Sequence, residues 1–173
     1  MDGVKSALRV KGELKITDAE KGPTHPGRTR QEVERFPADP DALLERFRTL
    51  ERERATLSLC QPNCPAGTAA DVKAFGAIGW YMKYGPLIPS DTAAAMYRAL
   101  AKIPNVKIEE NATDMDGRRG VGVVLDLGEA GKQYYILAPG DYRYLGTKIV
   151  DGGETSGMSV LASGIVDEAG QVP

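Results

Sequence analysis

Histidine and cysteine, which often carry the chemistry of a site, are scarce in this chain. Its 173 residues include one histidine, His25, and two cysteines, Cys60 and Cys64. A metal site usually takes about four ligands, so this composition excludes a histidine-rich centre. Two cysteines are also too few for a disulfide framework, and their number alone does not indicate the cellular compartment.

Long hydrophobic runs and an excess of one charge are missing as well. The most apolar stretch, residues 74–82, is far shorter than the roughly 20 residues of a membrane-spanning helix. The first ten residues lack the apolar segment of a signal peptide, so none is predicted. The formal net charge of −2 gives no reason to expect a nucleic-acid partner.

The length and the 42% hydrophobic content suit one soluble domain with its own core. We expect that domain to span residues 1–173 in three regions. These are a strand and loop region over 1–36, a helical region over 37–105 and an antiparallel meander over 106–170.

The clearest helix start lies in residues 37–57. Asp39 can accept hydrogen bonds from the exposed amides of the first turn. Pro40 suits the first helical position because its missing N–H would be unpaired there. The apolar positions with helical spacing are Leu43, Leu44, Phe47 and Leu50.

Two further helices are predicted over residues 68–85 and 89–105. Thr68 and Ser90 stand where side-chain caps are expected. Gly79, inside the second helix, either weakens it or allows close packing against a neighbour.

Strands are expected on both sides of the helices. Residues 6–19 partly alternate, which indicates one half-buried strand or a short strand pair, and residues 20–30 are expected to form a loop. After residue 105 the pattern has period two, with predicted strands at 105–113, 118–127, 132–138, 142–150 and 158–170. Short connections make neighbouring strands antiparallel. The predicted fold is α+β, a curved antiparallel sheet of about five to seven strands with three helices on one face.

The spacing of Cys60 and Cys64 leaves four alternatives open. A disulfide would close a small loop around the turn formers Pro62 and Asn63. A redox pair would more typically be CxxC at a helix start, and a metal site would need further ligands. The remaining alternative is a pair of free thiols.

Other motifs give no catalytic or cofactor site. His25 is interpreted as an exposed loop histidine, and no G-x-S-x-G nucleophile motif is present. Residues 114–117, "DMDG", predict a tight turn, because the twelfth position of a calcium loop would be Leu125 instead of glutamate. The glycines of residues 117–123 precede no helix, so we predict no phosphate cradle and no cofactor.

Aromatic residues gather around the second predicted helix. Phe75, Trp80, Tyr81 and Tyr84 are expected in the core. Alternatively, they line an apolar cleft between sheet and helices that takes a lipid-like ligand.

The stretch "MYRALAKIPNVKIEENATDMDGRRGVGV", residues 96–123, resembles a family of actinobacterial membrane-anchored proteins encoded beside extracytoplasmic-function sigma factors. Weaker similarity extends over residues 36–47, 142–150 and 166–173. The residues that match the family pattern best are Tyr97, Arg98, Ala99, Leu100, Ala101, Pro104, Val106, Asp116, Gly117, Arg118, Gly120 and Val121. A looser similarity, at the level of the fold, is to the half-barrels of lipoprotein carriers and envelope-stress sensors.

The resemblance implies an extracytoplasmic domain whose native chain is membrane-anchored through a helix upstream. In that compartment Cys60 and Cys64 are expected to form a structural disulfide. The implied function is a non-catalytic sensory or ligand-binding domain in sigma-factor signalling, with a cell-envelope protein or a small apolar ligand as partner. A lipid or lipoprotein carrier is the alternative, and an enzyme of unknown class is a third.

Overall fold

The fold combines a layer of helices with an antiparallel sheet, which confirms the predicted α+β class. It is seen in a computed structural model that describes residues 5–10, 13–18, 26–50, 59–60, 63–164, 166–167 and 171. The helices are α1 (Pro26–Val33), α2 (Pro40–Arg48), α3 (Ala69–Met82) and α4 (Ser90–Leu100), with short 3-10 turns η2 (Gly85–Leu87) and η3 (Gly128–Ala130). The strands are β1 (Lys5–Val10), β2 (Glu13–Asp18), β3 (Val106–Thr113), β4 (Arg119–Asp126), β5 (Lys132–Leu137), β6 (Tyr144–Asp151) and β7 (Glu154–Ser159).

Strands β3 to β7 form one sheet, in which each strand pairs antiparallel with the next along the chain. This order confirms the meander predicted from the period-two pattern. The register shifts between Glu109 and Ala112 on β3, and also between Ile136 and Leu137, where the extra residue is Leu145 on β6. Such bulges bend the strand that carries them, and the first of them lies beside the candidate site.

The last strand lies earlier in the chain than the sequence predicts. The expected strand covers residues 158–170, whereas β7 ends at Ser159. The cause is a tight turn at Gly152 and Gly153, whose φ angles are +56° and +88°. Glycine adopts these angles without steric cost, so the chain reverses directly after β6.

The N-terminal region holds a hairpin and a helix. β1 and β2 pair antiparallel in a two-stranded sheet, which is the strand-pair alternative for residues 6–19. The loop prediction for residues 20–30 is wrong from Pro26 onward, where α1 begins. Proline fits the first turn of a helix, so Pro26 marks a helix start.

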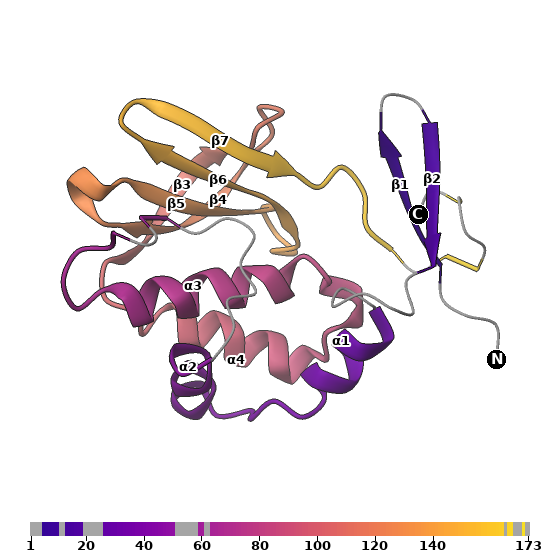
Figure 1. Cartoon of the computed structure of the whole chain (residues 1–173), viewed down its shortest axis with the longest axis horizontal. Helices are drawn as coiled ribbons and strands as arrows, with labels where there is room; N and C mark the ends of the chain where they lie inside the picture. Colours follow the sequence, from indigo (N-terminus) through magenta and orange to yellow (C-terminus); the bar gives the residue numbers. More distant parts are fainter. Residues whose placement is uncertain are drawn as a thin grey trace.

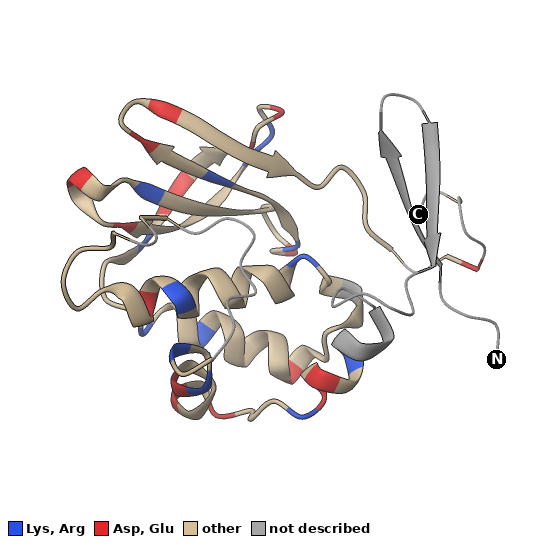
Figure 2. Ribbon diagram, viewed as in Figure 1, with Lys and Arg blue, Asp and Glu red and all other residues tan. Residues whose placement is uncertain are grey.

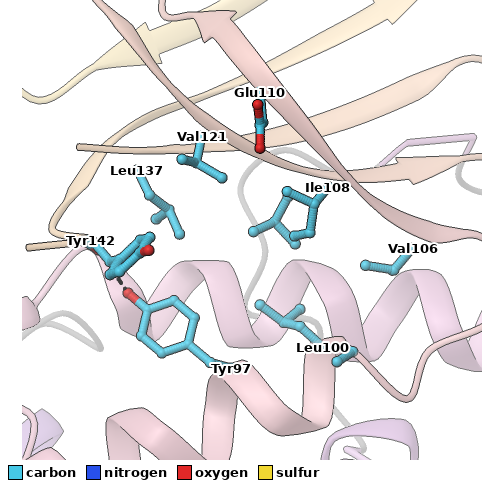
Figure 3. A pocket seen from close by; sticks show the side chains of 10 residues that line it. Tyr97, Leu100, Val106, Ile108, Glu110, Val121, Leu137 and Tyr142 are labelled. Carbon is cyan, nitrogen blue, oxygen red and sulfur yellow. Dashed lines mark hydrogen bonds between the residues drawn. The ribbon is translucent and has the colours of Figure 1, made fainter. Parts of the chain in front are cut away.

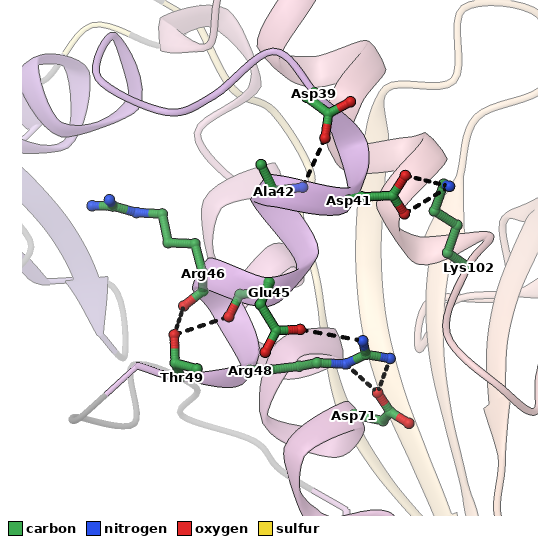
Figure 4. A network of polar contacts seen from close by, with 9 residues as sticks. All are labelled: Asp39, Asp41, Ala42, Glu45, Arg46, Arg48, Thr49, Asp71 and Lys102. Carbon is green, nitrogen blue, oxygen red and sulfur yellow. Dashed lines mark hydrogen bonds and ion pairs between the residues drawn. The ribbon is translucent and has the colours of Figure 1, made fainter.

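Helix α2 begins as predicted and ends earlier. The carboxylate of Asp39 accepts a hydrogen bond from the Ala42 amide at 2.8 Å, and Pro40 follows it (Figure 4). At the other end the Thr49 hydroxyl donates to the Glu45 carbonyl at 2.9 Å. The helix therefore stops at Arg48, while residues 51–58 of its predicted extension lie outside the described part of the chain.

The two other predicted caps are wrong. The Thr68 hydroxyl donates to the Pro65 carbonyl at 2.8 Å and makes no capping bond to α3. Ser90 is the first residue of α4 and not its cap, because Pro89 takes the extended conformation just before the helix.

The helices lie on one face of the sheet (Figure 1). Strand alternation divides the sheet residues between two clusters. Val123, Leu125, Tyr135 and Leu137 pack with the helices in the main core. On the opposite face Val124, Tyr134 and Ile136 belong to a smaller cluster.

The contact between α3 and β5 is very close. The rings of Phe75 and Tyr135 stack with centroids 4.4 Å apart, and the Tyr135 hydroxyl donates to the Phe75 carbonyl at 2.7 Å. One turn along α3, Gly79 faces the same tyrosine, and a Cβ atom at this position would overlap its ring. Of the two roles considered for Gly79, the structure supports close packing.

Ion pairs connect the helices at the surface of their layer. The Arg48 guanidinium of α2 lies 2.7 Å from the Asp71 carboxylate of α3, and Lys102 after α4 lies 2.7 Å from Asp41 (Figure 4). Elsewhere acidic and basic side chains are interspersed over the helices and the sheet (Figure 2). The Lys102–Asp41 pair is exposed and contributes little to stability compared with the core, whereas the Arg48–Asp71 pair is partly buried.

Gly79→Ala is expected to destabilise the fold by about 1–3 kcal/mol, because the added methyl group forces the buried Tyr135 ring to move. Urea unfolding measures the change. Gly85→Ala is the matched control, since a Cβ atom at Gly85 meets no atom within 4 Å. Equal stability of the two variants would contradict the close packing of α3 on β5.

Candidate functional site: an apolar groove beside helix α4

The helices leave one corner of the sheet uncovered. Val106 and Ile108 of β3 point to the helical side, opposite Leu125 and Val123 of β4. Val123 is buried, whereas the Ile108 side chain is 62% exposed. An exposed isoleucine on the face that elsewhere forms the core indicates an open apolar groove at this edge.

A cavity of about 430 Å³ occupies this corner (Figure 3). This volume lies within the roughly 300–1,000 Å³ of small-molecule sites. Helix α4 supplies one wall, β3 and β4 supply the other, and the loop before β6 closes one end. The lining residues are Tyr97, Leu100, Ala101, Val106, Ile108, Glu110, Val121, Val123, Leu137 and Tyr142. Apart from Glu110, this described lining is uncharged.

Tyr97 and Tyr142 hold the closed end of the groove together. The Tyr97 hydroxyl donates to the Tyr142 carbonyl at 2.9 Å. Burial, and then the nearby Asp141 carboxylate, raise the pKa of Tyr97, so its hydroxyl stays protonated as a donor. Tyr142 has a φ of +54°, a conformation that costs a non-glycine residue energy and occurs preferentially at functional sites.

A second cavity of about 330 Å³ lies on the other side of this tyrosine pair, which lines both cavities. It is more polar and includes Lys83, Asp141 and Arg143. Burial lowers the pKa of Lys83, whose ammonium lies 4.7 Å from the centroid of the Trp80 ring. An ammonium over an aromatic face is a favourable cation–π contact.

The aromatic residues suggested as cleft lining lie elsewhere. Phe75 and Tyr81 are fully buried, Trp80 is 7% exposed, and Tyr84 is half-buried at the margin of the core. None of the four is among the lining residues of the groove or of the second cavity. Phe75, Trp80 and Tyr81 thus occupy the core, the preferred interpretation of this stretch.

The sequence does not predict the groove residues as a site, although five of them belong to the family pattern: Tyr97, Leu100, Ala101, Val106 and Val121. Tyr97 and Tyr142 are 45 positions apart in the chain, and their pairing depends on the tertiary fold. Ile108 does carry a signal, because it belongs to the core-facing set of an alternating strand. Its exposure, however, depends on where the helices lie in the tertiary structure, which the strand pattern does not show.

Cys60 and Cys64 form a disulfide, with their Cα atoms 4.7 Å apart. Both pack at the margin of the main core. Leu59 is buried beside them, and its amide donates to the Gln133 side chain on β5 at 3.4 Å. The disulfide therefore fixes the short loop that leads into α3 against the sheet.

Asp114 has a larger structural role than a tight turn requires. Its buried carboxylate accepts hydrogen bonds from the Asp116 and Arg118 amides, at 3.0 and 2.9 Å. The Arg118 guanidinium lies 2.6 Å from it and also donates to the carbonyls of Leu145 and Val160. One ion pair thus joins the β3–β4 turn, β6 and the segment after β7.

Other predicted features can be placed only in part. His25 lies outside the described residues. Within the described part of the chain, no group of three or more histidine, cysteine or acidic residues could hold a metal ion. Among the described helices, none combines the length and apolarity needed to cross a bilayer.

Comparisons of the chain with protein-family models, curated proteins and solved structures find no match. The resemblance to the sigma-factor-associated family therefore stays a prediction from the sequence.

Removal of the disulfide by Cys60→Ser with Cys64→Ser is expected to cost about 2 kcal/mol, the loop-closure entropy of so short a loop. Urea unfolding of the variant and the oxidised wild type measures this difference. A thiol titration of unfolded, unreduced protein should find no free thiol, and a reduced sample gives the reference. Two titrating thiols in the unreduced sample would contradict the disulfide.

Asp114→Asn is expected to lower the free energy of unfolding by about 1–3 kcal/mol at neutral pH, because Arg118 loses its charged partner. Burial alone would raise the pKa of Asp114, but the hydrogen bonds from Arg118 and Asp116 hold it below its ordinary value of 3.8. The stabilisation is therefore complete above that pH and is lost as the pH falls through the lowered pKa.

Urea unfolding at about pH 7 and about pH 3 tests this dependence. We expect the difference in the free energy of unfolding between wild type and variant to be smaller at the lower pH. Asp116→Asn is the matched control, since it removes an exposed charge from the same turn and keeps the backbone amide. A gap that does not change with pH would show that the charge of Asp114 is not what stabilises the turn.

Proposed function

We propose that this chain is a non-catalytic extracytoplasmic ligand-binding domain that senses a small, largely apolar molecule. The observation that carries the proposal is the groove beside α4, with its uncovered Ile108. The binding step involves no covalent chemistry, because the groove offers shape, apolar surface and one carboxylate.

Apolar surface is the main source of affinity in this proposal. Leu100, Ile108 and Val121 approach the cavity from three different elements, α4, β3 and β4. A ligand that covers Ile108 and Val121 removes their exposed surface from water, at about 25 cal/mol per Å², whereas Leu100 is already buried. The ligand also bridges α4 and the β3–β4 pair, and a molecule that binds only the folded state stabilises it.

The cellular setting is proposed from the sequence and the disulfide together. The resemblance implies a membrane-anchored native chain in sigma-factor signalling. The Cys60–Cys64 disulfide supports an oxidising compartment, where such bonds persist. Ligand binding would then shift the anchored protein toward the conformation that binds the ligand more tightly. The size of the shift is set by the difference in ligand affinity between the two conformations.

A lipid or lipoprotein carrier is the second candidate. The observation in its favour is that the groove and the second cavity share Tyr97 and Tyr142. A longer ligand would have room on both sides of this tyrosine pair. A carrier would hold such a ligand without passing a signal through the anchor.

Titration with the uncharged fluorescent probe N-phenyl-1-naphthylamine tests the groove. We expect saturable binding, weakened at least about tenfold by Ile108→Glu, because a carboxylate would then need desolvation inside the apolar groove. Met158→Glu on β7 is the matched control, an exposed apolar residue of the same sheet that does not line the groove. Equal binding by the two variants would refute the groove as the site.

A further inference from the structure

We infer that the ligand of the groove is a cationic amphiphile, whose ammonium group pairs with Glu110 while its apolar part lies between β3 and α4. This inference rests on the proposed function and adds the chemical class of the ligand.

Glu110 lies on the groove side of β3. Strand alternation places it on the same face as Val106 and Ile108, and all three line the cavity. Figure 3 shows its carboxylate above the apolar side chains. The register of β3 shifts between Glu109 and Ala112. The regular alternation of side chains is therefore interrupted only after Glu110, whose side chain still lies on the groove side. The single charge of the described lining is thus negative.

Two lysines near this part of the sheet are already engaged. The Lys107 ammonium lies 2.7 Å from the Asp126 carboxylate, which also accepts Lys132 at 3.1 Å. Glu110 itself has no ion-pair partner among the described residues. A carboxylate that borders apolar surface and lacks a cation is complementary to a ligand that brings one.

The tyrosines at the closed end favour the same ligand class. Tyr97 and Tyr142 both line the groove, and their ring faces attract cations. The Tyr97 hydroxyl already donates to the Tyr142 carbonyl, so it is not available to hold an anion. Lys83 and Arg143, which would attract an anion, line the second cavity instead.

Three eight-carbon probes test the charge preference: octyltrimethylammonium, octanol and octanoate. The affinity of each probe is measured by its displacement of N-phenyl-1-naphthylamine from the full chain at low ionic strength. We expect the cation to bind about tenfold more tightly than octanol, the combined effect of one exposed ion pair and one cation–π contact. Octanoate should bind more weakly than octanol.

Glu110→Gln should reduce the preference for the cation to the part that the cation–π contact supplies, and it should leave the affinity for octanol unchanged. Glu109→Gln is the matched control, because it removes the same charge one residue away. Its carboxylate lies near Tyr134, which belongs to the cluster on the opposite face of the sheet. Thermal unfolding of each variant checks that the fold is intact.

The outcomes separate the inference from the proposed function. If no probe binds, the groove is not a ligand site and the proposed function fails. If octanol binds as tightly as the cation, or if Glu110→Gln keeps the full preference, the inference is wrong and the ligand-binding function stands. If octanoate binds most tightly, the ligand is an anionic amphiphile held toward Lys83, which overturns the inference in the same way.

Discussion

The close approach of α3 to β5 is the constraint on which the helical layer depends. Gly79 lets the helix backbone approach the Tyr135 ring closely, and the tyrosine hydroxyl donates a hydrogen bond to the Phe75 carbonyl. α3 is buried along most of its length, α2 packs against it, and α4 packs mainly against α2. The helical layer reaches Val106 of β3 but does not extend over Ile108, which is left without a cover. The groove therefore lies where the helical layer ends.

The two ends of the β3–β4 hairpin have different physical characters. At the turn, Arg118 forms an ion pair with the buried Asp114 carboxylate, and its guanidinium also donates hydrogen bonds to carbonyls of two other segments. On the strand, Ile108 and Glu110 face open space. A rigid turn beside an uncovered strand gives the groove a fixed wall, so a ligand need not order that wall when it binds. Preorganisation of this kind reduces the entropic cost of binding.

Local features of the fold could be predicted from the sequence, and features that depend on distant residues could not. Asp39 with Pro40 specified the start of α2 because a cap and the helix it caps are neighbours in the chain. Thr68 and Ser90 have the same cap chemistry and make no cap, because the Thr68 hydroxyl bonds to the Pro65 carbonyl and Pro89 takes the cap position before α4. The period-two pattern gave the order of the sheet, but Gly152 and Gly153 moved its last strand. Tyr97 and Tyr142 meet only after both layers have assembled, so the closed end of the groove had no sequence signal.

The bulge on β3 also affects how molecules can approach this edge of the sheet. A regular edge strand presents a row of backbone groups to which a strand of another chain can add, the first step of aggregation. Here the register breaks after Glu109, Asn111 adopts a φ of +62°, and charged side chains flank the break. The backbone hydrogen bonds between β3 and an incoming strand would be interrupted at that point. The edge can thus keep an exposed isoleucine while resisting self-association through backbone pairing.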